Sequence, residues 1–301
     1  MSVHPSQWVR TYLFWEINQP KLLGSSHTTM ATIRARELYN DIAFDYSAIK
    51  TNEFKRWIEE TTVLQAILHN GVKDKSVLDL GCGSGHFCRI LQKHGAKTVC
   101  GVDVSDEMIQ EAQRIESSAP LGIEYHRIDL LEHESCDLLQ MLGDGVAAMD
   151  LCASAYLFPY ASNAEDLRKF CRAAANALCS GGKFVSVTTV LTETMQDATT
   201  TGGILESKPW GFSIVWTTES ATDGMMADVT LLGEGRTSRV TFPNFFWSKT
   251  TITQALLDSG FANVEWFGHK VDESAPSNVR TEFQNEDSAL DAVGYFVATK
   301  Q

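Results

Sequence analysis

A glycine-rich turn between a short apolar segment and an amphipathic one constrains this chain more than any other feature. Residues 77–85 read VLDLGCGSG, with glycine at every second position from 81 to 85. The apolar residues 76–80 predict a buried strand, and residues 86–93 (HFCRILQK) predict a helix that ends at Gly95. Glycine lets the backbone turn tightly and approach a ligand, because no Cβ intervenes. Ligands of open α/β sheets bind beyond the carboxyl ends of the strands, so we expect a ligand site at this turn.

The rest of the chain alternates between apolar runs and amphipathic segments. Seven strands are predicted, at residues 76–80, 98–103, 123–128, 146–154, 183–190, 263–267 and 293–299. The helices between them include one capped by Asn163 and stopped by Gly181-Gly182, and one at 250–259 closed by Gly260. Strands separated by helices imply a parallel sheet covered on both faces. The predicted fold class is therefore α/β, with a doubly wound, mainly parallel, seven-stranded, Rossmann-like sheet.

The same pattern divides the chain into four parts. Residues 72–190 and 249–301 form the ligand-binding α/β domain, and residues 31–71 read as a helical N-terminal lid. Residues 1–30 are either a tail or an arm, since chain ends are often poorly ordered. Residues 191–248 carry many aromatic side chains and interrupt the alternation after the fifth strand. We expect this insertion to form short antiparallel strands, at 213–216, 228–232 and 239–242, and to cover the site.

The composition of the chain argues against two classes of binding partner, nucleic acids and membranes. Lysine and arginine number 25 and aspartate and glutamate 38, a formal charge of −13. An acidic chain is repelled by phosphate backbones and anionic membranes, so we expect neither as a partner. No stretch reaches the roughly 18 apolar residues of a membrane span, and no signal peptide is recognisable. The seven cysteines are scattered rather than spaced as CxxC, which favours reduced thiols in the cytoplasm and no metal site.

Two acidic residues restrict the class of ligand that this site can bind. Asp103 ends the second predicted strand, 20 residues after Gly83, where a carboxylate can accept both hydroxyls of a ribose. The dinucleotide fingerprint requires a third glycine where this chain has His86, and no GK[ST] of a P-loop follows. Asp79, directly before the turn, suits a cation rather than a pyrophosphate. An adenosine joined to an ammonium group fits both acids, and S-adenosylmethionine (SAM) is such a molecule.

At these residues the sequence resembles the class I SAM-dependent methyltransferases. The resemblance covers residues 36–190 clearly and 249–299 more loosely. It rests on VLDLGCGSG (77–85), GVDVSDEMIQEAQ (101–113), IEYHRIDL (123–130), ALCSGGKFVSV (177–187) and LLDSGFANVEW (256–266). It implies SAM as the methyl donor, S-adenosylhomocysteine as the product and no metal.

The resemblance also implies which residues bind the cofactor, moiety by moiety. The methionine part is surrounded by Asp79, Gly81 and Gly83, with Cys82 and Gly85 in the same turn; the ribose is held by Asp103; the adenine contacts Val104, Met108, Asp129 and Leu130; and the methyl-donor end borders Ala153 and Ser154.

A finer likeness is to small-molecule enzymes of the toxoflavin-synthase and glycine N-methyltransferase kind. It rests on residues 39–46 (YNDIAFDY), on 153–167 (ASAYLFPYASNAEDL) and on the aromatic insertion. In such enzymes the N-terminal segment folds over the cofactor, which implies that Tyr39 and Tyr46 touch it. Alternatively, both are ordinary residues of an amphipathic helix.

The segment after the fourth strand points to a small organic acceptor. It lacks the Asp/Asn-Pro-Pro-aromatic, Pro-Cys and paired-glutamate motifs of nucleic-acid and protein-arginine methyltransferases. Tyr156 and Tyr160 are candidates for orienting the acceptor, and His86 is a candidate base. Trp210, Phe212, Trp216 and Trp247 either wall the pocket or pack in the core of the insertion.

These features predict methyl transfer to nitrogen ahead of oxygen, by alignment and exclusion of water. O-methylation with His86 or Tyr156 as base or orienting group stays an alternative, as do a nicotinamide oxidoreductase and a non-catalytic SAM-binding module. The oligomeric state is open, with a homodimer among the alternatives.

Overall fold

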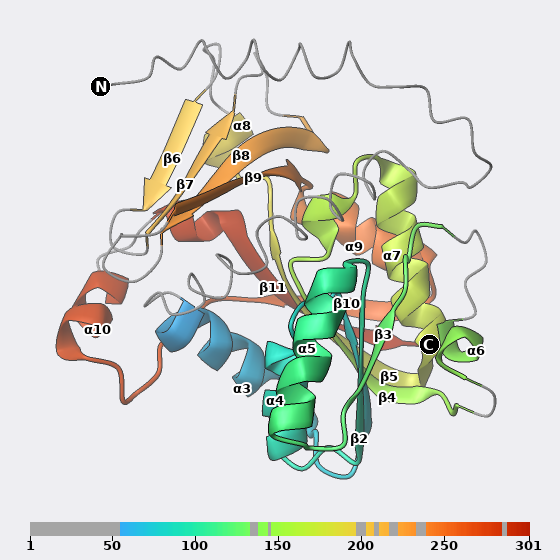
Figure 1. Ribbon diagram of the computed structural model, residues 1–301. Helices are drawn as coiled ribbons and strands as arrows, with labels where there is room; N and C mark the ends of the chain where they lie inside the picture. Colours follow the sequence, from blue (N-terminus) through green and yellow to red (C-terminus); the bar gives the residue numbers. More distant parts are fainter. Residues whose placement is uncertain are drawn as a thin grey trace, which may run out of the picture.

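The computed structural model describes residues 55–132, 138–143, 146–196, 203–207, 211–216, 222–232, 239–284 and 288–301. Its main element is a seven-stranded sheet in the order β10-β11-β5-β4-β1-β2-β3, in which β11 runs antiparallel to both neighbours (Figure 1). The strands are β1 (Ser76–Leu80), β2 (Thr98–Asp103), β3 (Glu124–Arg127), β4 (Met149–Ala155), β5 (Leu178–Thr189), β10 (Phe261–Phe267) and β11 (Val293–Lys300). The predicted doubly wound, mainly parallel sheet is confirmed.

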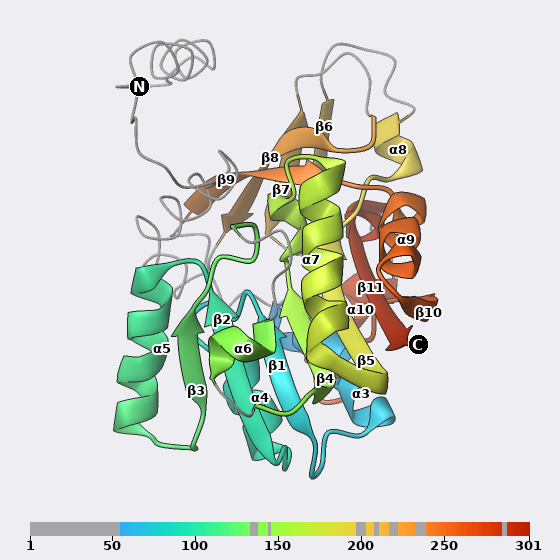
Figure 2. The ribbon, with the colours of Figure 1, turned by 90° about the vertical axis from the view of Figure 1, so that its right-hand side faces the viewer.

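Helices cover both faces of this sheet (Figure 2). The described helices are α3 (Glu60–Asn70), α4 (His86–Lys93), α5 (Asp106–Ser118), α6 (Leu138–Leu142), α7 (Ala164–Ala177), α8 (Glu193–Gln196), α9 (Lys249–Asp258) and α10 (Ser277–Gln284), with the shorter turns η2 (Phe158–Tyr160) and η4 (Ser288–Ala292). Val77 packs in the core that includes α3, α4 and α5, and Leu78 packs in the core that includes α6, α7 and α9. Successive residues of a strand face opposite sides, so β1 has to be apolar on both.

The junction of α7 and β5 differs from the prediction. The helix ends at Ala177 and β5 starts at Leu178, so Gly181-Gly182 does not stop the helix but lies within the strand. Leu178 pairs with Met149, whereas Lys183 pairs with Leu151, so four residues of β5 bulge out between the two paired positions. Gly181 has φ of +74°, a conformation that glycine adopts without strain.

The insertion after β5 forms a second, antiparallel sheet. Its strands pair in the order β6 (Gly203–Ser207), β7 (Phe212–Trp216), β8 (Met225–Leu232) and β9 (Arg239–Phe246). Three of the four strands were predicted; β6 was not, because it follows a run of threonine and glycine. This sheet lies above the carboxyl ends of the parallel strands (Figures 1 and 2).

The described part of the chain begins with a π-helical turn, η1 (Lys55–Glu59), that continues directly into α3. The predicted tail at 1–30, most of the predicted lid at 31–71, and both Tyr39 and Tyr46 lie outside the described residues. Within the described residues, none of the helices has the length and apolar character that crossing a membrane requires.

Candidate functional site

A pocket opens at the carboxyl ends of β1, β2 and β4, and encloses about 1190 Å³ when its open mouth is included. Its walls come from η1 and α3, the turn after β1, the ends of β2 and β4, and the segment after β3. The lining residues are Lys55, Glu59, Glu60, Asp79, Gly81, Cys82, Gly83, His86, Phe87, Val102, Asp103, Val104, Ile128, Asp129, Leu130, Leu131, Ala155, Tyr156, Leu157, Tyr160 and Phe170.

The glycine turn is held by the neighbouring strand. The amides of Gly81 and Cys82 both donate to the Val102 carbonyl oxygen at 2.9 Å, and the Gly83 amide donates to Asp103 Oδ2 at 2.8 Å. Gly81 and Gly83 have φ of +72° and +53°, which disfavours any residue with a Cβ. Both glycines and Cys82 line the pocket.

Gly85 has a different part in the turn. It does not line the pocket, and a Cβ at this position would lie 2.3 Å from the Tyr125 hydroxyl oxygen. The turn therefore needs this glycine for close packing against β3. Met108, another predicted cofactor contact, is buried beneath Gly83 and does not line the pocket either.

Asp103 is fixed at the end of β2 by two backbone amides. Its Oδ2 accepts from Gly83 and its Oδ1 accepts from Ser105 at 2.9 Å. Ser105 in turn caps α5, since its hydroxyl accepts from the Met108 amide. The carboxylate thus has a set orientation in the pocket wall, beside Val104.

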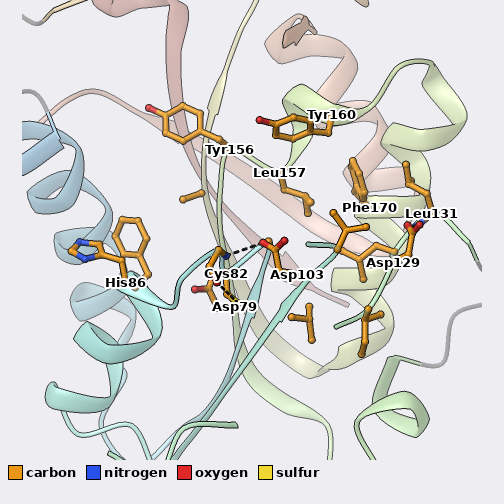
Figure 3. Close-up of a pocket in the computed structure, with 18 of the residues that line it drawn as sticks. Asp79, Cys82, His86, Asp103, Asp129, Leu131, Tyr156, Leu157, Tyr160 and Phe170 are labelled. Carbon is orange, nitrogen blue, oxygen red and sulfur yellow. Dashed lines mark hydrogen bonds between the residues drawn. The ribbon is translucent and has the colours of Figure 1, made fainter. Parts of the chain in front are cut away.

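The other two predicted acids also line the pocket. Asp79 is buried and accepts from the Cys88 thiol at 3.2 Å. Asp129 follows β3, and its Oδ1 accepts from the Leu131 amide at 2.9 Å. Leu130, the neighbouring predicted contact, lies in the same wall. Figure 3 shows Asp79 and Asp103 below the two tyrosine rings, and Asp129 farther along the pocket beside Phe170.

The segment after β4 reaches the pocket slightly later than predicted. Ala153 and Ser154 do not line the pocket but lie buried within the sheet, where the Ser154 hydroxyl shares a hydrogen bond of 2.8 Å with Ser186. Ala155 and Tyr156 line the pocket instead. Because β4 is buried from Leu151 to Ser154, only its last residue, Ala155, and the residues that follow it reach the cavity.

Tyr156 and Tyr160 both line the pocket, and their rings lie above the glycine turn (Figure 3). Tyr156 has φ of +60°, an unusual conformation for a bulky residue. Its hydroxyl donates to Glu59 Oε2 at 2.5 Å, and the Lys55 Nζ lies 5.5 Å from its ring centroid. This segment is therefore joined to the helix that precedes β1.

His86 lies at the opposite end of the pocket from Asp129 (Figure 3). Its Nε2 is 3.0 Å from Glu60 Oε2, and the histidine side chain is 43% exposed. A carboxylate at Nε2 favours the tautomer in which Nδ1 is the acceptor.

The aromatic residues of the insertion that the structure describes lie outside this pocket. Phe212 and Trp216 pack in the core that includes α3 and β5, and Trp247 is buried with its Nε1 donating to the Ala161 carbonyl oxygen at 3.0 Å. None of these three lines the pocket, and Trp210 lies outside the described residues. Of the two alternatives, packing within the core is what the structure shows for these three residues.

Three charged residues that sequence reasoning missed line the pocket: Lys55, Glu59 and Glu60. They come from η1 and the start of α3. Residues 55–62 (KRWIEETT) read as part of an amphipathic helix whose charged side faces solvent. No signal in the sequence indicates that this charged side borders a cavity.

The walls fit an adenosyl cation. Five carboxylates (Glu59, Glu60, Asp79, Asp103 and Asp129) face one lysine and one histidine, which favours a positively charged ligand. Apolar side chains surround the Asp103–Asp129 end, where a flat purine would be covered by Val104, Ile128, Leu130 and Leu157. Among the described residues no group of three histidine, cysteine or acidic side chains could share a metal ion, and the absence of a metal stays a prediction.

Comparisons with known proteins agree with this fold. Residues 77–182 match the family model of a methyltransferase domain. A ubiquinone biosynthesis O-methyltransferase of Coxiella burnetii is 30% identical over 102 residues, 34% of this chain and 39% of the relative. The protein arginine N-methyltransferase 1 of Saccharomyces cerevisiae is 38% identical over 73 residues, 23% of this chain and 21% of that protein. These matches therefore span about a fifth to two fifths of the curated relatives' own length.

A SAM-dependent methyltransferase from Clostridium acetobutylicum has a similar structure. Its TM-score is 0.55 at 17% identity, over 87% of this chain and 98% of that one. The fold is thus that of the class I SAM-dependent methyltransferases. The match to the methyltransferase-domain model covers residues 77–182 of this fold, which include the glycine turn at 81–85.

Proposed function

We propose that this protein transfers the methyl group of SAM to a small organic acceptor, at nitrogen ahead of oxygen. The observation that carries the proposal is the turn of Gly81 and Gly83, bound through Asp103 and bordered by Asp79, directly beneath two tyrosine rings. SAM, when bound, supplies a methyl group already activated on a positively charged sulfur. The finer likeness to toxoflavin synthase and glycine N-methyltransferase belongs to this proposal.

The acidic residues and the glycine turn each bind a different part of the cofactor. Asp79, with Gly81, Cys82 and Gly83, holds the methionine part, and the buried carboxylate faces its ammonium group. Asp103 accepts from the ribose hydroxyls, while Val104, Asp129 and Leu130 contact the adenine. Gly85 and Met108 support the turn from below, since neither reaches the pocket.

The acceptor is oriented from the other side of the pocket. Tyr156 and Tyr160 provide two aromatic faces on which a flat or positively charged acceptor packs. Because the donor is already activated, these residues contribute alignment and exclusion of water. The insertion sheet, which lies over the carboxyl ends of the parallel strands, is proposed to limit access from above.

The His86–Glu60 pair favours a second candidate, transfer to a hydroxyl. Glu60 at Nε2 leaves Nδ1 of His86 as a base for a hydroxyl acceptor. The relative from Coxiella burnetii is named as an O-methyltransferase. A rate that falls on the acid side of the pH profile, and loses this dependence in the His86→Ala variant, would select this candidate.

Ligand binding tests the proposal directly. We expect SAM and S-adenosylhomocysteine to raise the melting temperature, and NAD to leave it unchanged. Stabilisation by NAD alone would replace the proposal with a nicotinamide oxidoreductase. Binding of SAM without transfer to any amine, alcohol or phenol would indicate a non-catalytic binding module.

A further inference from the structure

Glu59 is a buried acid in the pocket wall that the cofactor assignments leave unused. Glu59 is only 4% exposed to solvent, yet it lines the pocket. Its one hydrogen bond within the described residues comes from the Tyr156 hydroxyl. No lysine or arginine of the described residues forms an ion pair with it, and Lys55 places its Nζ over the Tyr156 ring.

Two further groups that interact electrostatically with Glu59, Tyr295 and His269, do not supply a counter-charge. The Tyr295 hydroxyl is neutral, because burial, helped by Glu59, raises the pKa of Tyr295 well above its usual value. Burial lowers the pKa of His269, so this imidazole is neutral at pH 7 as well. Because Glu59 has no ion pair within the part of the chain that the structure describes, a ligand that brings a positive charge would stabilise its buried carboxylate.

The backbone is unusual at both partners of this hydrogen bond, Glu59 and Tyr156. Glu59 ends the π-helical turn η1, and such turns are rare and frequent at functional sites. Its partner Tyr156 has φ of +60°. Strained residues persist where the surrounding structure determines them, and they cluster at functional sites. Two independent irregularities therefore set one carboxylate and one aromatic ring beside each other in the pocket.

We propose that Glu59, held by Tyr156, selects a positively charged aliphatic amine as the methyl acceptor. The ammonium group binds the Glu59 carboxylate, and the rings of Tyr156 and Tyr160 pack against its carbon substituents and its charge. This inference rests on the proposed methyl transfer and names its substrate class. A neutral alcohol of the same shape leaves the carboxylate without a counter-charge and binds less well.

Transfer requires a neutral nitrogen, so one ammonium proton moves to the Glu59 carboxylate and from there to solvent. The amine nitrogen then forms a bond to the methyl carbon with its lone pair. The carbon–sulfur bond breaks with its electron pair remaining on sulfur, and the positive charge passes from sulfur to the methylated nitrogen.

The test compares amines with alcohols of equal shape. Benzylamine and butylamine, with benzyl alcohol and butanol, are titrated calorimetrically into the protein saturated with S-adenosylhomocysteine and then assayed with SAM. We expect the amines to bind and to be methylated, and the alcohols to do neither. Amines that bind no better than the alcohols would overturn the inference, as would methylation of none of them by a protein that binds SAM.

Variants separate the acceptor site from the cofactor site. Glu59→Gln should weaken benzylamine binding at least about tenfold, the equivalent of about 1.4 kcal/mol, and change SAM affinity less than about twofold. Glu59→Asp, which keeps the charge, should retain part of the preference for amines. Glu111→Gln removes the same charge from an exposed pair with Arg114 and serves as the matched control.

The outcomes distinguish the two proposals. Unchanged amine binding in Glu59→Gln overturns the role of Glu59 alone. Failure of the wild-type protein to bind SAM overturns the proposed function. If Glu59→Gln does not fold, the wild-type comparison still tests the preference for amines over alcohols, and Glu59→Asp tests whether that preference depends on this residue.

Discussion

Asp103 joins two functions in one side chain. Its two oxygens hold the amides of Gly83 and Ser105, so the same carboxylate fixes the glycine turn and the start of α5. A carboxylate oxygen can accept more than one hydrogen bond, so a ribose hydroxyl can share this carboxylate with the amides. A change at this residue therefore alters ligand contacts and the shape of the turn together.

We expect Asp103→Ala to weaken SAM binding at least about tenfold, since hydrogen bonds to a charged acceptor each contribute about 1.5–3 kcal/mol. Calorimetric titration with SAM measures this change. The same titration on Glu111→Gln controls for the loss of a negative charge at a distance. An Asp103→Ala protein that is folded and retains the wild-type affinity would contradict the assignment of this site.

Gly85 allows a sharp comparison, because Gly122 has nearly the same positive φ in open surroundings. Their φ values are +78° and +80°, but a Cβ at Gly85 meets the Tyr125 hydroxyl, whereas at Gly122 it meets nothing within 4 Å. Both alanine variants carry a left-handed strain of about 1–2 kcal/mol. Gly85→Ala adds an overpacking cost of about 1–3 kcal/mol, which urea unfolding should resolve as the larger loss of stability. Equal losses would show that Tyr125 moves aside at little cost.

At the scale of elements, Trp247 joins the insertion to the acceptor side of the pocket. It follows β9, and its indole nitrogen donates to the carbonyl oxygen of Ala161, the residue directly after η2 and Tyr160. The backbone also connects here, since the Leu191 amide donates to the Trp247 carbonyl oxygen. Trp247 thus supports the pocket from behind without lining it.

Trp247→Phe keeps the aromatic ring and removes the donor. A buried carbonyl left unpaired costs about 1–3 kcal/mol, so we expect a lower melting temperature and an altered acceptor KM, with SAM affinity preserved. Phe245→Leu, at a half-buried position two residues earlier, controls for repacking of β9. An unchanged KM in a destabilised Trp247→Phe protein would limit the role of the indole to stability.

The elements that could be predicted from the sequence are those in which the backbone geometry or burial allows only a few residue types. The glycine turn, the acid that ends β2 and the strands buried on both faces follow from such restrictions. The start of β5 could not be predicted, because a glycine pair reads equally as a helix stop and as a bulge. Glu59 could not be predicted either, since an acid on an amphipathic helix reads the same beside solvent and beside a cavity. The tryptophans of the insertion were ambiguous between core and pocket for the same reason.

At the scale of the whole molecule, buried thiols make the fold sensitive to alkali. Burial raises the pKa of Cys100 to about 12 and that of Cys88 and Cys171 well above the usual value of 9.0. Above pH 9.0 the unfolded chain loses these protons while the folded chain keeps them. The unfolded state then binds fewer protons, so the free energy of unfolding decreases as the pH rises. The stabilisation is complete below pH 9.0 and, for Cys100, is lost towards pH 12.

Each such thiol contributes a slope of about 1.4 kcal/mol per pH unit once the unfolded form is ionised. We therefore expect the urea midpoint to fall steeply between pH ~8 and pH ~10.5, and Cys171→Ala to make that fall shallower by one thiol's share. Leu167→Ala, a cavity variant at a buried position of the same helix α7, should lower the midpoint by a similar amount at both pH values. A fall in Cys171→Ala as steep as in the wild-type protein would mean that this thiol ionises equally in both states, and that the alkaline instability arises elsewhere in the molecule.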